Sequence, residues 1–458
     1  MPGRERRLKQ GKPGALRSRP GREENMLEKS TFETKRDRAV LVGLSSPRLE
    51  AAERSDEGSM EELAALVETA GGEAVGLVLQ NRDTPEARTF FGEGKVAEIK
   101  TLVETAEATL VICDNELSPS QMRVLTETLG VQVLDRSGLI LDIFAGRAKT
   151  REGRLQVELA QYQYLLPRLT GMWGHLVRQT ASGGRSPIGT RGPGETQLET
   201  DRRHIRRKIE KLREELEDVR RIRATARGRR VKNEVPVVAI VGYTNAGKST
   251  LLNALTGAGI PANDRLFDTL DTTTRTLEIS DTCTVLLSDT VGFIRKLPHQ
   301  LVDAFKATLE ELSYADLLLH VIDASNPEWR GQVNVVESLI RELGAERTPR
   351  LDVFNKADLY TGDIRPHGRD IVSVSAQTGA GLADLRAAIA ARLDRGARRV
   401  TLALPYEKTG LLDLLYRDAK VISVEYGDKV EVKAVCTPKT LGQVQAYIRE
   451  EGGAHAPD

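Results

Sequence analysis

The chain has 458 residues, enough for about three domains of ordinary size, and its 40% hydrophobic content is that of a globular protein. It contains no apolar run near the roughly 18 residues that span a bilayer, and its amino terminus has no apolar signal core. Its three cysteines are widely scattered, which indicates neither a disulfide framework nor a zinc site. We therefore expect a cytoplasmic protein without a membrane span.

The formal net charge of +1 hides two basic segments. Residues 1–22 hold eight Lys or Arg and one Glu, and residues 151–230 hold nineteen Lys or Arg and ten Asp or Glu. Such segregation favours contact with a polyanion, although a basic tail is often disordered and a charged helix face is often only solvated. We interpret residues 1–37 as a basic disordered tail.

Residues 38–150 alternate short apolar runs with helical patterns. The runs at 38–44, 72–80, 108–115 and 131–136 are typical of strands. The segments at 60–71, 95–106 and 118–130 have helical periodicity and each closes near a Gly or a strand. This alternation predicts an amino-terminal α/β domain with a parallel sheet.

Two heptad stripes mark residues 151–230. The first comprises Leu155, Leu159, Tyr162, Leu166, Leu169 and Trp173. The second comprises Leu198, Ile205, Ile209, Leu212, Leu216 and Val219. Two stripes joined by a long loop predict an antiparallel helical hairpin, in which Pro167 should kink the first arm. Because the second arm is densely charged outside its stripe, we expect the hairpin to project into solvent.

The stretch GYTNAGKS fits the phosphate-loop pattern G-x-x-x-x-G-K-[ST], and it follows a predicted strand and begins a helix. In that context backbone N–H groups wrap the phosphates, Lys248 bridges the β- and γ-phosphates, and the Ser249 hydroxyl binds Mg²⁺. The residues predicted to bind nucleotide here are Gly242, Tyr243, Thr244, Asn245, Ala246, Gly247, Lys248, Ser249 and Thr250.

Three further motifs follow in the order typical of a GTPase. In the first, DTVG, the Asp would hold Mg²⁺ and the Gly amide would sense the γ-phosphate. In the second, NKAD, a carboxylate can accept the two N–H donors of guanine, which adenine cannot satisfy. The third, SAQ, offers backbone amides to the guanine carbonyl. The corresponding residues are Asp289, Thr290, Val291, Gly292, Asn355, Lys356, Ala357, Asp358, Ser375, Ala376 and Gln377. Together the motifs predict a GTPase domain over residues 235–395, with GTP as substrate.

The first switch segment should supply a threonine that completes the Mg²⁺ shell only while the γ-phosphate is present. Spacing from the phosphate loop favours Thr269, with Thr273 as runner-up. The predicted binding residues of this segment are Phe267, Asp268, Thr269, Leu270 and Asp271, and the predicted Mg²⁺ ligands are Ser249, Thr269 and Asp289. We expect Lys248, Thr269 and Gly292 to be the catalytic residues.

One departure bears on the rate of hydrolysis. After the DTVG motif, familiar GTPases have a Gln that orients water, whereas this chain has Phe293. An apolar side chain cannot orient water, so intrinsic hydrolysis should be slow unless a partner orders the site. Asn245 raises the hypothesis of a bound K⁺ that replaces an arginine finger, with bracing of the first switch as the equal alternative.

Residues 398–450 predict a small α+β carboxy-terminal domain. The fold class expected for the whole chain is α/β multidomain: an α/β domain, a helical hairpin, a P-loop GTPase domain with a mostly parallel sheet, and this small domain.

The sequence resembles the HflX family of ribosome-associated GTPases from about Arg38 to Ile448. The most specific resemblance lies in FFGEGKVAEI, in the run Val133–Leu169, in GPGETQLETDRR and in DTVGFI. Asp268 and Thr272 depart from the family's usual Ala and Pro in the first switch, which puts the stiffness of that segment in doubt. The resemblance implies binding to the large (50S) ribosomal subunit and dissociation of stalled or idle 70S ribosomes under stress. It also implies that the hairpin loop approaches the peptidyl-transferase region.

The loop Arg178–Arg203 interleaves Arg with Gly and Ser, which suits contact with an RNA backbone. Two alternatives are an ATP-binding loop at Gly192–Thr196 and a plain connector. Against ATP binding, the loop has no strand before it, no Lys-Ser/Thr after it and no acidic partner.

Other functions also stay open. The chain could be a nucleotide-gated scaffold that dimerises through the hairpin as a coiled coil, or a GTPase that acts in tRNA modification or at a membrane. We expect a monomer that contacts rRNA.

Overall fold

A computed structural model of the chain describes residues 36–180, 197–232, 235–257, 259, 266–267, 273–280, 283–362, 366–393 and 398–449. All but the last two residues of the predicted basic tail, and most of the loop Arg178–Arg203, lie outside these residues. Within the described ranges, no helix is both long enough and apolar enough to cross a bilayer.

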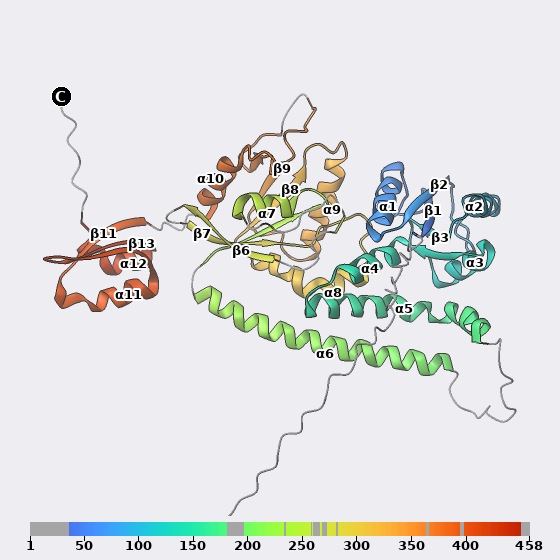
Figure 1. The fold of residues 1–458 in the computed structure, drawn as a ribbon, viewed down its shortest axis with the longest axis horizontal. Helices are drawn as coiled ribbons and strands as arrows, with labels where there is room; N and C mark the ends of the chain where they lie inside the picture. The colour runs from blue at the N-terminus through green and yellow to red at the C-terminus, as the bar shows by residue number, and fades with distance from the viewer. Residues whose placement is uncertain are drawn as a thin grey trace, which may run out of the picture. The chain divides into compact units, whose positions relative to one another are not determined.

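A parallel sheet of four strands forms the first layer, in the order β2-β1-β3-β4 (Figure 1). Its strands are β1 (Arg38–Ser45), β2 (Glu73–Asn81), β3 (Leu110–Cys113) and β4 (Gln132–Asp135). Helices α1 (Glu57–Ala70), α2 (Glu93–Thr105) and α3 (Pro119–Leu129) connect them. Side chains cap two of these helices, since Asp56 accepts from the Ser59 amide and Ser118 from the Gln121 amide. The predicted alternation of strands and helices is confirmed.

Helix α4 (Arg136–Arg147) was not predicted from the sequence. Asp135 caps it by accepting from the Gly138 amide, so the helix begins directly at the end of β4. Eight of its twelve residues are buried, which removes the amphipathic period on which a sequence prediction depends.

The predicted hairpin consists of α5 (Arg151–Thr180), which continues through Pro167 as one helix, and α6 (Gln197–Lys232). In α6 the stripe residues Ile209, Leu212 and Leu216 are buried, as expected. The expectation that the hairpin projects into solvent is wrong for its described base. There α5 is buried on a second face as well, through Val157, Ala160, Tyr164 and Arg168, and packs against α3, α4 and α8.

The GTPase sheet has six strands in the order β10-β9-β8-β5-β7-β6. Of these, β6, β7, β8 and β9 are labelled in Figure 1. Only β6 runs antiparallel to its neighbour, so the sheet is mostly parallel, as predicted. The strands are β5 (Val237–Gly242), β6 (Thr273–Ser280), β7 (Cys283–Asp289), β8 (Leu317–Asp323), β9 (Arg350–Asn355) and β10 (Ile371–Ser373). The helices are α7 (Lys248–Thr256), α8 (His299–Leu309), η1 (Glu310–Tyr314), α9 (Trp329–Glu342) and α10 (Leu382–Leu393).

The carboxy-terminal segment forms an antiparallel sheet in the order β11-β13-β12, covered by short helices. Its elements are β11 (Arg398–Leu404), η2 (Tyr406–Lys408), α11 (Gly410–Asp418), β12 (Ala419–Tyr426), β13 (Val430–Cys436), α12 (Pro438–Val444) and η3 (Gln445–Tyr447). The fold class predicted from the sequence is confirmed.

One hydrophobic cluster joins α4, α5 and α6 to the face of the GTPase sheet that α8 and α9 cover, and it includes Tyr243, Val291 and Phe293. Phe144 of α4 lies between the rings of Phe267 and Phe305, with centroid distances of 4.7 and 5.7 Å. The face of the GTPase sheet that α7 and α10 cover has a cluster of its own, and so has the carboxy-terminal sheet. Part of the candidate site, including Tyr243, Val291 and Phe293, is therefore packed against the elements that precede the GTPase domain in the chain.

Candidate nucleotide site

The phosphate loop joins β5 to α7 and has the backbone shape that its glycines permit. Gly242, Asn245 and Gly247 have φ angles of 153°, 60° and 87°. A Cβ on Gly242 would lie 2.3 Å from the carbonyl oxygen of Val321, and one on Gly247 would lie 2.3 Å from Asn355 Nδ2. The loop can follow this path only because these two positions carry no side chain.

Lys248 begins α7 and is buried. Its Nζ donates a hydrogen bond to the backbone oxygen of Tyr243 at 2.7 Å. Burial lowers the pKa of Lys248 to about 8, against the opposing effect of the Asp289 carboxylate. A phosphate group would supply the negative charge that this ammonium lacks.

The two oxygen donors predicted for Mg²⁺ lie together. The Ser249 hydroxyl donates to Asp289 Oδ2 at 2.8 Å, beside the buried Lys248. Among the described residues, no group of three or more His, Cys, Asp or Glu could hold a metal ion. A hydroxyl and a carboxylate are ligands that suit Mg²⁺, which commonly takes its remaining ligands from water and substrate phosphates. The residues present therefore fit a nucleotide-dependent Mg²⁺.

The segment after β7 is held against the phosphate loop. The Thr290 hydroxyl donates to the Ile240 carbonyl at 2.7 Å, and the Thr244 amide donates to the Phe293 carbonyl at 2.7 Å. A Cβ on Gly292 would lie 2.9 Å from Lys248 Nζ, so the backbone passes close to the ammonium. This geometry suits an amide that meets the terminal phosphate, while the adjoining Val291 is buried.

The ring of Phe293 is only 1% exposed and belongs to the hydrophobic cluster that joins α4 to the GTPase sheet. Its side chain therefore lies in the core, where it cannot orient a water molecule.

The residues predicted for guanine gather at the ends of β9 and β10. Asn355 is buried; its Nδ2 donates to the Ala246 carbonyl at 2.9 Å and its Oδ1 accepts from the Ala376 amide at 3.0 Å. The amide side chain thus ties the phosphate loop to the SAQ loop. Ser375 is buried in that loop, whereas Asp358 and Gln377 are exposed and accessible to a base. Ala357 donates its amide to the Val374 carbonyl, and Lys356 pairs with Asp323 at 2.7 Å.

Of the first switch, only Phe267 and the half-buried runner-up Thr273 are described. The Phe267 amide donates to the Thr244 hydroxyl at 3.0 Å. Its ring is 1% exposed and packs on Phe144, so the side chain contributes to the core instead of facing a nucleotide. Asp268, Thr269, Leu270 and Asp271 lie outside the described residues.

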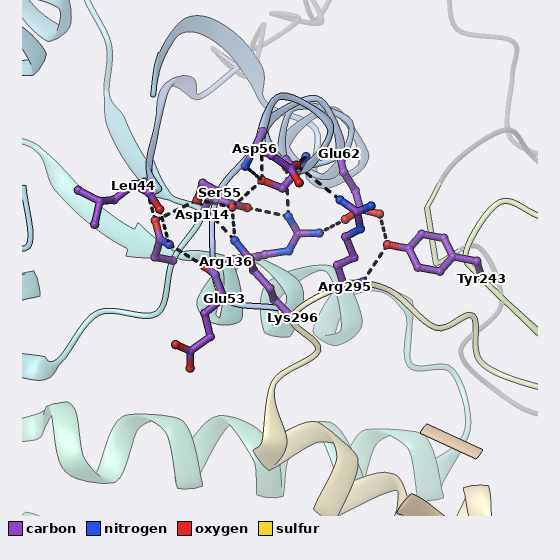
Figure 2. A network of polar contacts seen from close by, with 12 residues as sticks. Leu44, Glu53, Ser55, Asp56, Glu62, Asp114, Arg136, Tyr243, Arg295 and Lys296 are labelled. Carbon is purple, nitrogen blue, oxygen red and sulfur yellow. Dashed lines mark hydrogen bonds and ion pairs between the residues drawn. The ribbon is translucent and has the colours of Figure 1, made fainter. Parts of the chain in front are cut away.

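A polar network beside the phosphate loop was missed by the sequence analysis (Figure 2). The Tyr243 hydroxyl donates to Glu62 Oε1 of α1 at 2.6 Å and accepts from the Arg295 amide at 2.9 Å. Glu62 also pairs with Arg136 of α4, which in turn contacts Asp114 at 2.8 Å. The sequence offered one signal for this network, the large aromatic residue Tyr243 inside a glycine-rich loop. That signal does not identify the residue that Tyr243 contacts.

Known protein families match most of the chain. Three family models match successive segments: a "GTP-binding GTPase N-terminal" model at residues 57–145, a "GTP-binding GTPase Middle Region" model at 147–230, and a "50S ribosome-binding GTPase" model at 237–356.

Curated relatives described as GTPase HflX cover nearly the whole sequence. The protein of Caldanaerobacter subterraneus subsp. tengcongensis is 49% identical, over 90% of this chain and 94% of its own. That of Escherichia coli is 45% identical, over 83% of this chain and 88% of its own. A GTP-binding protein from Sulfolobus solfataricus, solved with GDP, is 27% identical and covers 78% of this chain and 98% of its own, with a TM-score of 0.41.

Proposed function

This chain belongs to the HflX family of GTPases, so it binds and hydrolyses GTP, and we propose that it acts in the cytoplasm on the large (50S) ribosomal subunit. There it dissociates stalled or idle 70S ribosomes, in contact with rRNA through the hairpin. The observation that carries this proposal is the hydrophobic cluster that α5 and α6 share with Tyr243 of the phosphate loop and with Val291 and Phe293 of the segment after β7. A change of nucleotide that moves these residues would reach the hairpin through packed side chains.

Each predicted site residue has a separate task in this proposal. Lys248 binds the β- and γ-phosphates, and the Gly292 amide meets the γ-phosphate. The Asp358 carboxylate selects guanine, because adenine would leave its oxygens unpaired. Ser249 and Asp289 would hold Mg²⁺, with Thr269 of the first switch, and the bound ion would neutralise charge that develops on the phosphates.

The buried ring of Phe293 supports slow intrinsic hydrolysis. Since no side chain at that position can orient water, we expect contact with the ribosome to raise the rate.

The exposed face of α6 supports contact with RNA phosphates. Arg206 and Arg207 are exposed, and no carboxylate in the described part of the chain lies within ion-pair distance of either. Arg213, also exposed, is instead paired with Glu210 at 3.0 Å. Unpaired guanidinium groups can bind phosphate without first breaking an existing ion pair. We propose the same contact with RNA phosphates for four residues of the hairpin loop: Arg178, Arg185, Arg191 and Arg202.

Sedimentation of 70S ribosomes through sucrose gradients tests the proposal. With protein and a non-hydrolysable GTP analogue, we expect the 70S peak to fall and the protein to move with the 50S subunit. With GDP, both effects should weaken. Equal cosedimentation with triphosphate, diphosphate and no nucleotide would contradict the coupling between nucleotide and hairpin.

Substitutions on α6 test the RNA contact separately. Arg206→Ala combined with Arg207→Ala should weaken binding to the 50S subunit and reduce the slope of log affinity against log salt by about one to two. The matched control is Arg213→Ala, which removes an already paired charge. GTP affinity should stay unchanged in all variants. A salt slope that does not distinguish the pair from the control would count against contact through this face.

We also propose K⁺ beside Asn245, whose exposed side chain extends from the loop at a φ of 60°. Hydrolysis should then be faster in KCl than in NaCl at equal ionic strength. Equal hydrolysis rates in the two salts would contradict a role for K⁺ and leave bracing of the first switch as the role of Asn245.

A further inference from the structure

The side chain of Tyr243 lies where three segments meet. It belongs to the phosphate loop, its hydroxyl donates to Glu62 of α1 at 2.6 Å, and the same oxygen accepts from the Arg295 amide at 2.9 Å. The ring is 4% exposed. Glu62 comes from the amino-terminal α/β layer, 181 positions earlier in the chain, so this contact joins two parts of the protein.

Glu62 is held by a network of alternating charges (Figure 2). It pairs with Arg136, which is 1% exposed and also contacts Asp114 at 2.8 Å. Asp114 is completely buried; it accepts from Ser55 at 2.7 Å and pairs with Lys296. Two carboxylates therefore face two cations, and each group has an opposite charge beside it. Such a network holds Glu62 in one position, because moving it would leave the buried Arg136 without one of its two carboxylate partners.

The network also contacts the segment that follows Gly292. The Phe293 amide donates to the Gly242 carbonyl at 3.1 Å, and its carbonyl accepts from Thr244. Two residues further on, the Arg295 amide donates to Tyr243, and Lys296 pairs with Asp114. The backbone that would meet the γ-phosphate is thus fixed on one side by the phosphate loop and on the other by the amino-terminal layer.

We propose that Glu62 and Tyr243 are positioning residues for GTP hydrolysis: Glu62 fixes the Tyr243 hydroxyl, and that hydroxyl fixes the phosphate loop against the segment 293–296. The amino-terminal α/β layer thereby completes the geometry of a site whose binding residues all belong to the GTPase domain. This inference concerns intrinsic hydrolysis, so it stands or falls independently of ribosome binding.

The test is single-turnover hydrolysis by full-length Tyr243→Phe, without ribosomes. This change removes one hydroxyl and no charge, so the protein should fold. We expect the rate at saturating GTP to fall about tenfold, as for the loss of a hydrogen bond to a charged group. The GDP dissociation constant and the KM should stay within about threefold of wild type, because the loop, Lys248 and Asn355 still bind the nucleotide.

Two controls separate positioning from folding. Tyr164→Phe removes a similarly buried hydroxyl, which donates to Asp135 at 2.7 Å and not to Glu62, and should leave the rate unchanged. Glu68→Gln removes an exposed charge on the same helix as Glu62 and should also have no effect. Glu62→Ala should slow hydrolysis as Tyr243→Phe does, and the double variant should be no slower than the slower single variant.

Three results would overturn the proposal. The first is a rate for Tyr243→Phe within twofold of wild type. The second is an equal loss in Tyr164→Phe, which would indicate a general effect of destabilisation. The third is a rise in KM with an unchanged rate at saturation, which would make the hydroxyl a determinant of binding alone. Should Glu62→Ala prove too unstable to assay, the comparison of the two tyrosine variants decides the matter.

Discussion

The two ends of the nucleotide site are built differently. At the base end, Asn355 bonds to Ala246 and Ala376, and these contacts stay within the GTPase domain. At the phosphate end, Tyr243 reaches α1 and Phe267 packs on α4, both from the amino-terminal layer. The contacts described for the residues predicted to recognise guanine therefore stay within one domain, whereas residues beside the predicted phosphate site also contact a second. Changes in the amino-terminal layer should alter hydrolysis more than they alter nucleotide choice.

The largest effect is expected at the base end. Asp358→Asn should lower GTP affinity by about 100-fold or more, because guanine's N–H donors then meet an amide that cannot accept both. Xanthosine triphosphate, which carries a carbonyl in place of guanine's amino group, should gain affinity from the new donor. Competition binding with both nucleotides checks this, and an unchanged preference for guanine would place base recognition elsewhere.

A pH effect should follow at the phosphate end. The pKa of Lys248 is about 8 because burial disfavours its charge, and bound phosphates favour that charge and so raise the pKa. Binding then takes up a proton above about pH 8, so GDP affinity should fall as pH rises from there, by up to about tenfold per pH unit.

Fluorescence titration with GDP between pH 7.5 and 9 measures the effect of Lys248. Lys248→Arg, which keeps its charge in this range, is the control. If the GDP affinities of the two proteins changed with pH in the same way, Lys248 would not titrate between pH 7.5 and 9.

A smaller effect tests the aromatic contact between the domains. Phe144→Leu should lower the free energy of unfolding by about 1–2 kcal/mol and slow hydrolysis a few-fold, since Phe267 and Phe305 lose a partner. Phe91→Leu is the matched control: it is equally buried, in the separate cluster around β1, and should destabilise without slowing hydrolysis. Urea unfolding and single-turnover assays give both quantities, and equal rate losses would refute a specific role of Phe144.

The smallest effect is expected where the carboxy-terminal sheet meets β6. Lys420 pairs with Glu278 at 3.2 Å, and both side chains are at least half exposed. Lys420→Ala should change the free energy of unfolding by no more than about 0.5 kcal/mol. A loss above about 1 kcal/mol in urea unfolding would show that this sheet is tied to the GTPase domain more firmly than one surface ion pair allows.

The sequence predicted those features that depend on short-range pattern. Strands β1 to β4 and helices α1 to α3 alternate with clear periods, α1 and α3 end at Gly71 and Gly130, and the phosphate loop carries its own signature. Helix α4 was missed because burial on most sides erases its period. The second buried face of α5 was also missed. The heptad stripe predicts contact with α6 alone and does not indicate the contacts of α5 with α3, α4 and α8.

The polar network could not be predicted from one sequence. Charged side chains usually lie on the surface, so the sequence alone predicts an exposed Arg136. It is buried instead, because Glu62 and Asp114 face it from two other elements. Such a position depends on contacts between residues that are far apart in the chain. The roles of the predicted site residues, Thr269 above all, remain predictions for the experiments above.

The packing of Phe144 against Phe305 also bears on how the protein is made. These rings are about 160 residues apart, so a ribosome that adds roughly 5–20 residues per second needs roughly 8–32 s to supply the second after the first. During that interval the apolar surface of α4 has no GTPase domain to cover it. The nascent chain should therefore depend on chaperones until most of its length has been synthesised.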